Sequence, residues 1–249
     1  MVSGPVYDQI GVGYRSRRQP EPQWAARLSE AIGDGRSVLN VGAGTGSYEP
    51  DDRFTVAVEP SITMVAQRPR GSAPVVRAVS EHLPIADGSF DVALAVLTLH
   101  HWSDPVVGLA ELRRVSRRQV LVTWDPVLTR EYWLVREYLP QIEQWEANLA
   151  TLPTAIEQLI GARVEPLPVP AQCRDGVMAA YWQRPEAYLD PSVRAAISNV
   201  SLMDASIVAE AMARLEHDLA DGTWLARHRD LLDRSELDVG YRLVVAGES

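Results

Sequence analysis

A loop of three alternating glycines is the strongest chemical signal in this 249-residue sequence. Gly42, Gly44 and Gly46 follow directly on the apolar run 38–41. Glycine permits positive φ angles and leaves no side chain between the backbone and a ligand. At the carboxyl end of a parallel strand, such a loop is where an α/β sheet binds its ligand. The pattern predicts a ligand-binding loop over residues 42–46, with a tight turn that binds nothing as the alternative.

The spacing of these glycines separates two classes of cofactor. A dinucleotide fingerprint, G-x-G-x-x-G, would need its third glycine at position 47, which is Ser47, whereas here it stands at Gly46. A dinucleotide site also holds its pyrophosphate at the N-terminus of the following helix. Here Glu49, Pro50 and two aspartates follow the loop, and they are poor neighbours for a diphosphate. A cofactor without phosphate fits better, and a nicotinamide or flavin cofactor is the rival.

A carboxylate at the end of the next apolar run supports a nucleoside ligand. Glu59 closes the run 54–58 and stands 17 residues after Gly42 (59 − 42). A carboxylate at this point can accept hydrogen bonds from both hydroxyls of a ribose. The few residues after Glu59 include no Arg, so a 2′-phosphate is not expected.

Four sequence blocks in order resemble the class I S-adenosylmethionine-dependent methyltransferases, in particular the type 11 group, which is similar to enzymes of ubiquinone and menaquinone biosynthesis. The first two blocks are the glycine loop and a Glu-Pro-Ser-Ile-Thr-Met stretch. The third is Ser-Glu-His-Leu-Pro-Ile-Ala-Asp-Gly-Ser-Phe-Asp, and the fourth is Leu-Thr-Leu-His-His-Trp. The blocks occupy residues 38–47, 58–64, 79–92 and 97–102. The resemblance covers roughly residues 7–125 and gives no information on residues 126–249.

The resemblance implies S-adenosylmethionine as the cofactor, with S-adenosylhomocysteine as its product. The loop would approach the methionine portion, Glu59 would hold the ribose, and Met64 and Ile62 would pack on the adenine. Arg18 would pair with the cofactor carboxylate, since a guanidinium binds a carboxylate bidentately. Two positions depart from the family, which more often has an acidic residue at Asn40 and an Asp at Val79. The expected cofactor-binding residues are Tyr14, Arg18, Asn40, Gly42, Ala43, Gly44, Gly46, Glu59, Pro60, Met64, Ser80, Glu81 and Leu97.

Two adjacent histidines are the candidate catalytic residues. Methyl transfer from a sulfonium is an in-line displacement that depends mainly on alignment of the reactants, and a base is needed only when the acceptor must lose a proton. His100 and His101 follow the fourth apolar run, where side chains should face the methyl group. Either could act as base or orient the acceptor, with His101 slightly favoured, and simple packing is the alternative. We expect no metal site, because neighbouring residues on a turn rarely bind one ion.

The order of apolar runs and helices predicts an α/β fold. Runs that are apolar on both faces suit strands buried between helix layers, and their alternation with helices favours a parallel sheet. We expect a Rossmann-like, mostly parallel sheet of about seven strands with helices on both faces, plus a helical cap inserted before the last strand. The expected strands are 38–41, 54–58, 75–79, 90–97, 119–124, an edge strand over 164–169, and 237–246. The expected parts are an N-terminal helical lid (1–36), the core (37–170), the cap (171–235) and the last strand (236–249).

Composition narrows the possible functions further. All 24 basic residues are Arg, so chemistry that needs a Lys, such as a Schiff base or a P-loop, is excluded. A net charge of −9 argues against nucleic acid as a partner. One Cys, no leader-like start and no long apolar run favour a cytoplasmic protein without a membrane partner. Trp and Tyr residues between 124 and 188 would either line a cavity for a flat, aromatic small-molecule acceptor or fill a core.

We therefore expect S-adenosylmethionine-dependent methyl transfer to a small organic acceptor. An NAD-dependent oxidoreductase is the first alternative. A non-catalytic cofactor-binding protein on the same fold is the second, since methyl transfer requires no particular side chain. The sequence predicts neither the acceptor nor the oligomeric state.

Overall fold

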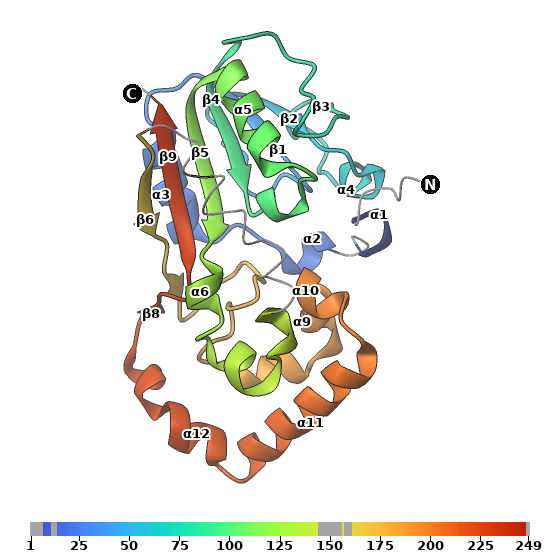
Figure 1. Ribbon diagram of the computed structural model, residues 1–249, viewed down its shortest axis with the longest axis vertical. Helices are drawn as coiled ribbons and strands as arrows, with labels where there is room; N and C mark the ends of the chain where they lie inside the picture. The colour runs from blue at the N-terminus through green and yellow to red at the C-terminus, as the bar shows by residue number, and fades with distance from the viewer. Residues whose placement is uncertain (1–6, 11–13, 144–155, 157–160, 248–249) are drawn as a thin grey trace.

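The computed structural model describes residues 7–10, 14–143, 156 and 161–247, and these build a seven-stranded sheet with a helical cap beyond one end (Figure 1). The strand order is β3-β2-β1-β4-β5-β9-β6. The strands are β1 (Ser37–Val41), β2 (Phe54–Val58), β3 (Val75–Val76), β4 (Phe90–Val96), β5 (Ser116–Trp124), β6 (Arg163–Pro166) and β9 (Tyr241–Gly247).

The sheet is mostly parallel, as the sequence predicts. Strands β1 to β5 pair in parallel, whereas β9 runs antiparallel between β5 and β6. The strand β6 lies at the edge, where its Pro166 costs no ladder hydrogen bond. The α/β fold class and the Rossmann-like sheet are confirmed.

Several predicted strands have different bounds in the structure. The fifth begins earlier, at Ser116, and the predicted edge strand over 164–169 is divided between β6, which ends at Pro166, and a short strand at Val169–Pro170. The third ends at Val76 and not at residue 79. The last is divided, because Glu236–Leu237 (β8) pairs with Val169–Pro170 (β7) in a separate small sheet. Gly240 then turns the chain with a φ of 102°, and its N–H donates to Asp238 Oδ1. The strand within the main sheet therefore begins only at Tyr241.

Helices cover both faces of the sheet because its strands are apolar on both faces. Val38 packs in one buried cluster with Trp24 and Leu28 of α3 (Pro22–Ile32). Its neighbour Leu39 points the other way and packs with Leu109 of α5 (Pro105–Val115). Both helices begin at a carboxylate cap followed by proline, a sequence arrangement that favours a helix start.

The connection from β1 to β2 contains no helix. Residues 42–53 form turns and bends only. A dinucleotide site uses a helix N-terminus at this point to hold its pyrophosphate. The local backbone therefore lacks the element that the oxidoreductase alternative requires.

The cap is built from short helices beyond the carboxyl ends of β4 and β5 (Figure 1). Its interior is aromatic: Trp133 Nε1 donates to the carbonyl of Trp182, and the hydroxyls of Tyr132 and Tyr188 lie 2.7 Å apart. Most of the Trp and Tyr residues between 124 and 188 are therefore part of the buried core of the cap. Trp145 lies outside the described residues. The cap elements are α6 (Pro126–Thr129), η2 (Leu134–Tyr138), η3 (Pro185–Leu189), α9 (Pro191–Ala195), α10 (Ser198–Ser201), α11 (Ala205–Ala220), α12 (Thr223–His228) and η4 (Arg229–Asp233).

The N-terminal segment lies between the sheet and the cap (Figure 1). Its helices are α1 (Tyr7–Ile10) and α2 (Tyr14–Arg17). Asp8 accepts hydrogen bonds from Ser61 and Thr63 at the start of α4 (Ile62–Ala66), which fixes α1 to the sheet side. Among the described residues, no helix is long and apolar enough to cross a bilayer. The division of the chain into lid, core and cap remains our proposal with one change. The sequence prediction places 126–143 in the core (37–170), and we move these residues to the cap because α6 and η2 lie among the cap elements (Figure 1).

Candidate cofactor and acceptor site

A cavity of about 490 Å³ lies at the carboxyl ends of the parallel strands. Every residue predicted to contact the cofactor lines it except Gly46 and Ile62, and both candidate histidines line it too. The predicted residues come from five separate segments of the chain, and the fold brings these segments together around one cavity. The lining residues that the prediction did not include are Tyr7, Thr45, Ser47, Tyr48, Ala78, Val79, Val96, Thr98, Trp102 and Ser103.

The glycine loop adopts the backbone conformation that requires glycine. Gly42, Gly44 and Gly46 have φ angles of 70°, 53° and 87°. A Cβ at Gly42 would lie 1.9 Å from Thr98 Oγ1, so the loop packs directly on the segment after β4. The first glycine therefore serves close packing between two strand ends.

Replacement of Gly42 by Ala should destabilise the protein by roughly 2–4 kcal/mol, because left-handed backbone strain adds to a clash with Thr98. Gly88 is a matched control, since its φ is 59° and a Cβ there would meet nothing within 4 Å. Gly88→Ala should cost only about 1–2 kcal/mol from strain. Urea unfolding of both variants measures the difference, and equal losses would show that the Thr98 contact is unimportant.

A buried ion pair supports the loop from beneath. Arg68 Nη2 donates to both carboxylate oxygens of Glu49, each at 2.7 Å, and the two side chains are only 5% and 8% exposed. Asn40 Nδ2 donates to the same carboxylate at 3.3 Å. Gly46 lies over this pair, since a Cβ there would be 3.0 Å from Glu49 Oε2. The role of Gly46 and Asn40 in the structure is thus to let the loop close on Glu49.

Glu59 is held by the loop that it faces. Its two oxygens accept the N–H groups of Gly44 and Ser61, both at 2.8 Å, and the residue is 5% exposed. Burial raises the pKa of this carboxyl, although the hydrogen bonds from Ser61 and Gly44 oppose the rise. Each carboxylate oxygen has a second lone pair. Glu59 can therefore accept two further hydrogen bonds from a ligand in the cavity.

Further lining residues add apolar and polar side chains to the cavity. Met64 is 2% exposed and lines the cavity, whereas Ile62 is 58% exposed and does not. The expectation that Ile62 packs on an adenine is wrong, because the first turn of α4 points it to solvent. Ser80 donates to Glu81, whose other oxygen accepts from Ser103 and from the Asp104 N–H. Burial would raise the pKa of Glu81, but these donors lower it overall.

Arg18 is anchored by a residue from the cap. It forms a buried ion pair and an isolated β-bridge with Asp175, which is 1% exposed. Its Nη1 donates to the Tyr14 hydroxyl at 2.7 Å, and the Tyr48 hydroxyl donates to Asp175 at 2.9 Å. Burial alone would lower the pKa of Arg18, but Asp175 and Tyr14 raise it well above its usual value. A guanidinium has five N–H donors, so Arg18 retains donors for a ligand.

The two histidines have different surroundings. His101 Nε2 lies 3.1 Å from the Tyr7 hydroxyl, and burial, together with Arg18, lowers its pKa to about 4. Burial, His101 and Arg18 lower the pKa of His100 well below its usual value. His100 Nδ1 is buried without a hydrogen-bond partner in the described structure. Both rings are therefore uncharged at neutral pH, and burial makes each of them a weaker proton acceptor than an exposed imidazole.

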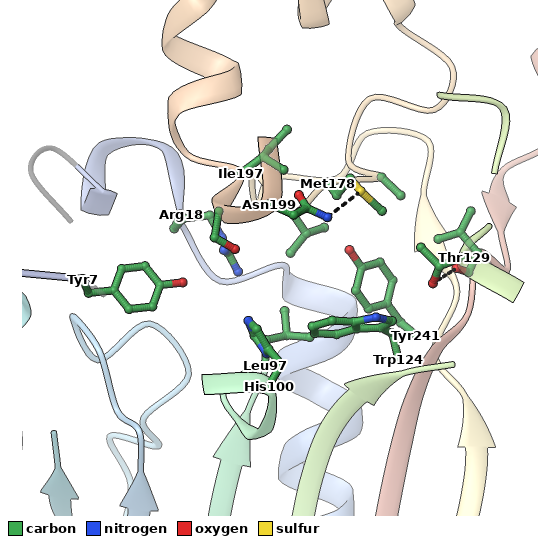
Figure 2. A pocket seen from close by; sticks show the side chains of 14 residues that line it. Tyr7, Arg18, Leu97, His100, Trp124, Thr129, Met178, Ile197, Asn199 and Tyr241 are labelled. Carbon is green, nitrogen blue, oxygen red and sulfur yellow. Dashed lines mark hydrogen bonds between the residues drawn. The ribbon is translucent and has the colours of Figure 1, made fainter. Parts of the chain in front are cut away.

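Leu97 marks the boundary between the cavity and a smaller pocket. It has a φ of 51°, and no other described non-glycine residue has a positive φ. Such a conformation costs energy in a residue with a Cβ. Leu97 and His100 both line the smaller pocket of about 60 Å³ that Figure 2 shows between the strand ends and the cap. The strained backbone therefore occurs where the two spaces meet.

Sequence reasoning missed Asp175 and Tyr48, which hold Arg18 in place. Asp175 lies 157 residues after Arg18, in a part of the chain without a recognised motif. Its one available signal was the Arg-Asp-Gly tripeptide at 174–176. Among the described residues, no group of three or more His, Cys, Asp or Glu side chains could hold a metal ion.

Comparisons with known proteins agree with this geometry. Residues 39–122 match the type 11 family model described as a methyltransferase domain. A crystal structure of a candidate methyltransferase from an antibiotic biosynthesis pathway of Anabaena variabilis has a TM-score of 0.86 and 28% identity, over 93% of this chain and 99% of that one.

Curated relatives match a shorter stretch. A demethylmenaquinone methyltransferase of Beutenbergia cavernae is 35% identical over 102 residues, which is 38% of this chain and 42% of the relative. One from Mycobacterium sp. (strain JLS) is 32% identical over 116 residues, which is 43% of this chain and 50% of the relative. The chain thus spans about half the length of the curated relatives that it matches.

The sheet, the glycine loop and the carboxylate after β2 define a class I S-adenosylmethionine-dependent methyltransferase fold. Within that class, residues 39–122 are similar to the methyltransferase domain of the type 11 family. The comparisons give no support to the oxidoreductase alternative.

Proposed function

We propose that the protein transfers a methyl group from S-adenosylmethionine to a small, flat, aromatic acceptor. The observation that carries this proposal is Glu59, a buried carboxylate that faces the 490 Å³ cavity with both oxygens already oriented by backbone N–H groups. A ribose diol is the ligand group that such a paired acceptor suits best. The turn-only segment 42–53 favours a nucleoside without a pyrophosphate.

The residues of this chain would bind and orient the reactants. Glu59 would hold the ribose, Met64 would contact the adenine, and Arg18 would donate to the cofactor carboxylate. The bound cofactor supplies an electrophilic methyl group on a sulfonium. Alignment of acceptor, methyl carbon and sulfur can lower a barrier by about 7–11 kcal/mol, so a rigid cavity supports much of the reaction.

We assign the leading role near the methyl group to His100 in preference to His101. His100 lines both the cavity and the smaller pocket, whereas His101 lines the cavity alone. The Tyr7 hydroxyl also lies against the His101 ring nitrogen. The uncharged His100 would orient the acceptor or receive its proton.

Ligand-dependent unfolding tests the proposal. S-Adenosylmethionine or S-adenosylhomocysteine at a hundredfold excess over its dissociation constant should raise the unfolding free energy by about 2.7 kcal/mol. NAD at the same concentration should produce no shift. Stabilisation by NAD alone would support the oxidoreductase alternative, and binding without methyl transfer to any member of a broad acceptor panel would support a non-catalytic role.

The acceptor and the location of the protein belong to the proposal as well. Two relatives bear the name of an enzyme that acts on demethylmenaquinone, which contains a flat ring. This supports a ring compound as the acceptor here. A cytoplasmic location rests on the sequence composition.

A further inference from the structure

A second, smaller pocket adjoins the cofactor cavity. Four residues line both spaces: Tyr7, Arg18, Leu97 and His100. The smaller pocket measures about 60 Å³, against about 490 Å³ for the cavity. Sites for drug-sized ligands begin at roughly 300 Å³, so the larger space suits a nucleoside. The smaller pocket is below the roughly 150 Å³ of a cavity that holds benzene, so a ring that enters it must extend into the larger space. A ligand in each would meet at Leu97 and His100.

The smaller pocket is electrically neutral. Arg18 is the one charged residue among its described lining residues, and Asp175 compensates that charge. His100 adds no charge, since burial lowers its pKa well below neutrality. An ion that entered the pocket would lose its hydration without gaining a free counter-charge. The pocket therefore favours an uncharged ligand.

Aromatic rings give the pocket a flat shape. In Figure 2 the indole of Trp124 extends beneath the opening, and the ring of Tyr241 stands beside it. The rings of His100 and Trp124 meet edge to face, with centroids 4.5 Å apart. Met178 and Ile197 from the cap close the other side. Ring faces on one side and aliphatic groups on the other suit a planar ring.

Two residues that line this pocket each have a buried polar atom without a partner among the described residues. Trp124 Nε1 and His100 Nδ1 are both buried, and neither has a hydrogen-bond partner in the described structure. An unpaired buried donor is unfavourable. The indole N–H can only donate, so a ligand that satisfies it must bring an acceptor atom.

We propose that this pocket holds the methyl acceptor, and that the acceptor is an uncharged, flat ring compound with an oxygen that accepts a hydrogen bond from the Trp124 N–H. The inference rests on the proposed function, because it assigns the second substrate of the same reaction. It makes Trp124 a specificity-determining residue and leaves cofactor binding to Glu59 and the glycine loop.

Four probes of one skeleton test the inference on the S-adenosylhomocysteine-loaded protein by calorimetry. Acetophenone is uncharged and has a carbonyl oxygen, ethylbenzene lacks the oxygen, benzoate is anionic and 1-phenylethylamine is cationic. Acetophenone should bind at least about fivefold more tightly than ethylbenzene and about tenfold more tightly than either ion. Benzoate or the amine binding as tightly as acetophenone would overturn the inference, as would no acetophenone binding.

A pair of Trp→Phe variants tests the role of the N–H group. Trp124→Phe should weaken acetophenone binding about tenfold but ethylbenzene binding less than about threefold. Trp224→Phe is the control, because Trp224 also has a buried, unpartnered Nε1 but lines neither space. It should leave acetophenone affinity unchanged. Equal losses for both probes in Trp124→Phe would contradict the hydrogen bond.

Binding of S-adenosylhomocysteine alone is measured first, and it separates the two levels of the argument. A protein that does not bind it refutes the proposed function and the inference together. A protein that binds it, but does not discriminate among the four probes, refutes only the inference.

Discussion

Replacement of Glu59 by Gln should weaken binding of S-adenosylhomocysteine by about a hundredfold. Hydrogen bonds to a charged group contribute about 1.5–3 kcal/mol each, and the proposed ribose contact uses two of them. The amide also places an NH₂ group against the Gly44 or the Ser61 N–H, each of which now donates to a carboxylate oxygen. Both effects remove affinity, and the second lowers stability by about 1–3 kcal/mol.

Glu21 provides the matched control for this substitution. It is 3% exposed, and its two oxygens accept the N–H groups of Gln23 and Arg174. It lines neither the cavity nor the smaller pocket. Glu21→Gln should therefore lose a similar amount of stability while its affinity changes less than about threefold. Equal affinity losses in the two variants would show that Glu59 acts only on folding.

Two further measurements locate the contact within the ligand. 5′-Methylthioadenosine has the ribose but lacks the amino-acid end. Glu59→Gln should therefore weaken its binding as much as it weakens the binding of S-adenosylhomocysteine. Because burial raises the pKa of Glu59 above its usual value, affinity in the unmodified protein should fall as the pH decreases through that raised pKa. Protonation converts an acceptor oxygen into a donor. Glu59→Gln should lose this pH dependence, and isothermal titration across the acidic range tests it.

The elements that follow from local pattern could be predicted from sequence. Val38 and Leu39 both read as apolar, and the structure buries them on opposite faces of β1. Glu59 was predictable because its position depends only on two adjacent parallel strands with a short connection. In each case the determining contacts are local or follow from strand order, so the spacing of residues carries the information.

Features that depend on distant contacts could not be predicted. The left-handed backbone of Leu97 arises where β4 ends against the glycine loop and β5, and no residue type signals it. The divided last strand depends on pairing of β8 with β7, some 67 residues earlier (236 − 169). The exposed position of Ile62 depends on how α4 rotates after its Ser61 cap. Each of these three features is determined by tertiary packing, so it could not be predicted from the spacing of residues along the chain.

Replacement of Asp175 by Asn should destabilise the protein by roughly 3–5 kcal/mol. Removal of one partner from a buried ion pair leaves the other charge uncompensated, and Arg18 is only 13% exposed. The Tyr48 hydroxyl and the β-bridge between Arg18 and Asp175 join the same contact. Urea unfolding measures the loss, and a change below about 1 kcal/mol would place this pair with weak surface pairs.

A double-mutant cycle separates the ion pair from general damage to packing. Arg18→Leu should also be costly, because it leaves Asp175 buried without its cation. The double variant Arg18→Leu/Asp175→Asn should lose less than the sum of the two single losses, since no unpaired charge remains. Strict additivity would mean that the two residues do not interact.

The single variant Asp175→Asn also tests how the cap contributes to the cofactor site. Asp175 does not line the cavity, so it can affect the cofactor only through Arg18 and Tyr48, the two lining residues whose side chains it contacts. Asp175→Asn should weaken S-adenosylhomocysteine, whose carboxylate would meet Arg18, by about tenfold. The affinity for 5′-methylthioadenosine, which lacks the carboxylate, should change less than about threefold. Glu59→Gln differs, because it should weaken the binding of both ligands equally. An equal loss for both ligands in Asp175→Asn would assign Asp175 to general stability, whereas the selective loss makes it a positioning residue contributed by the cap.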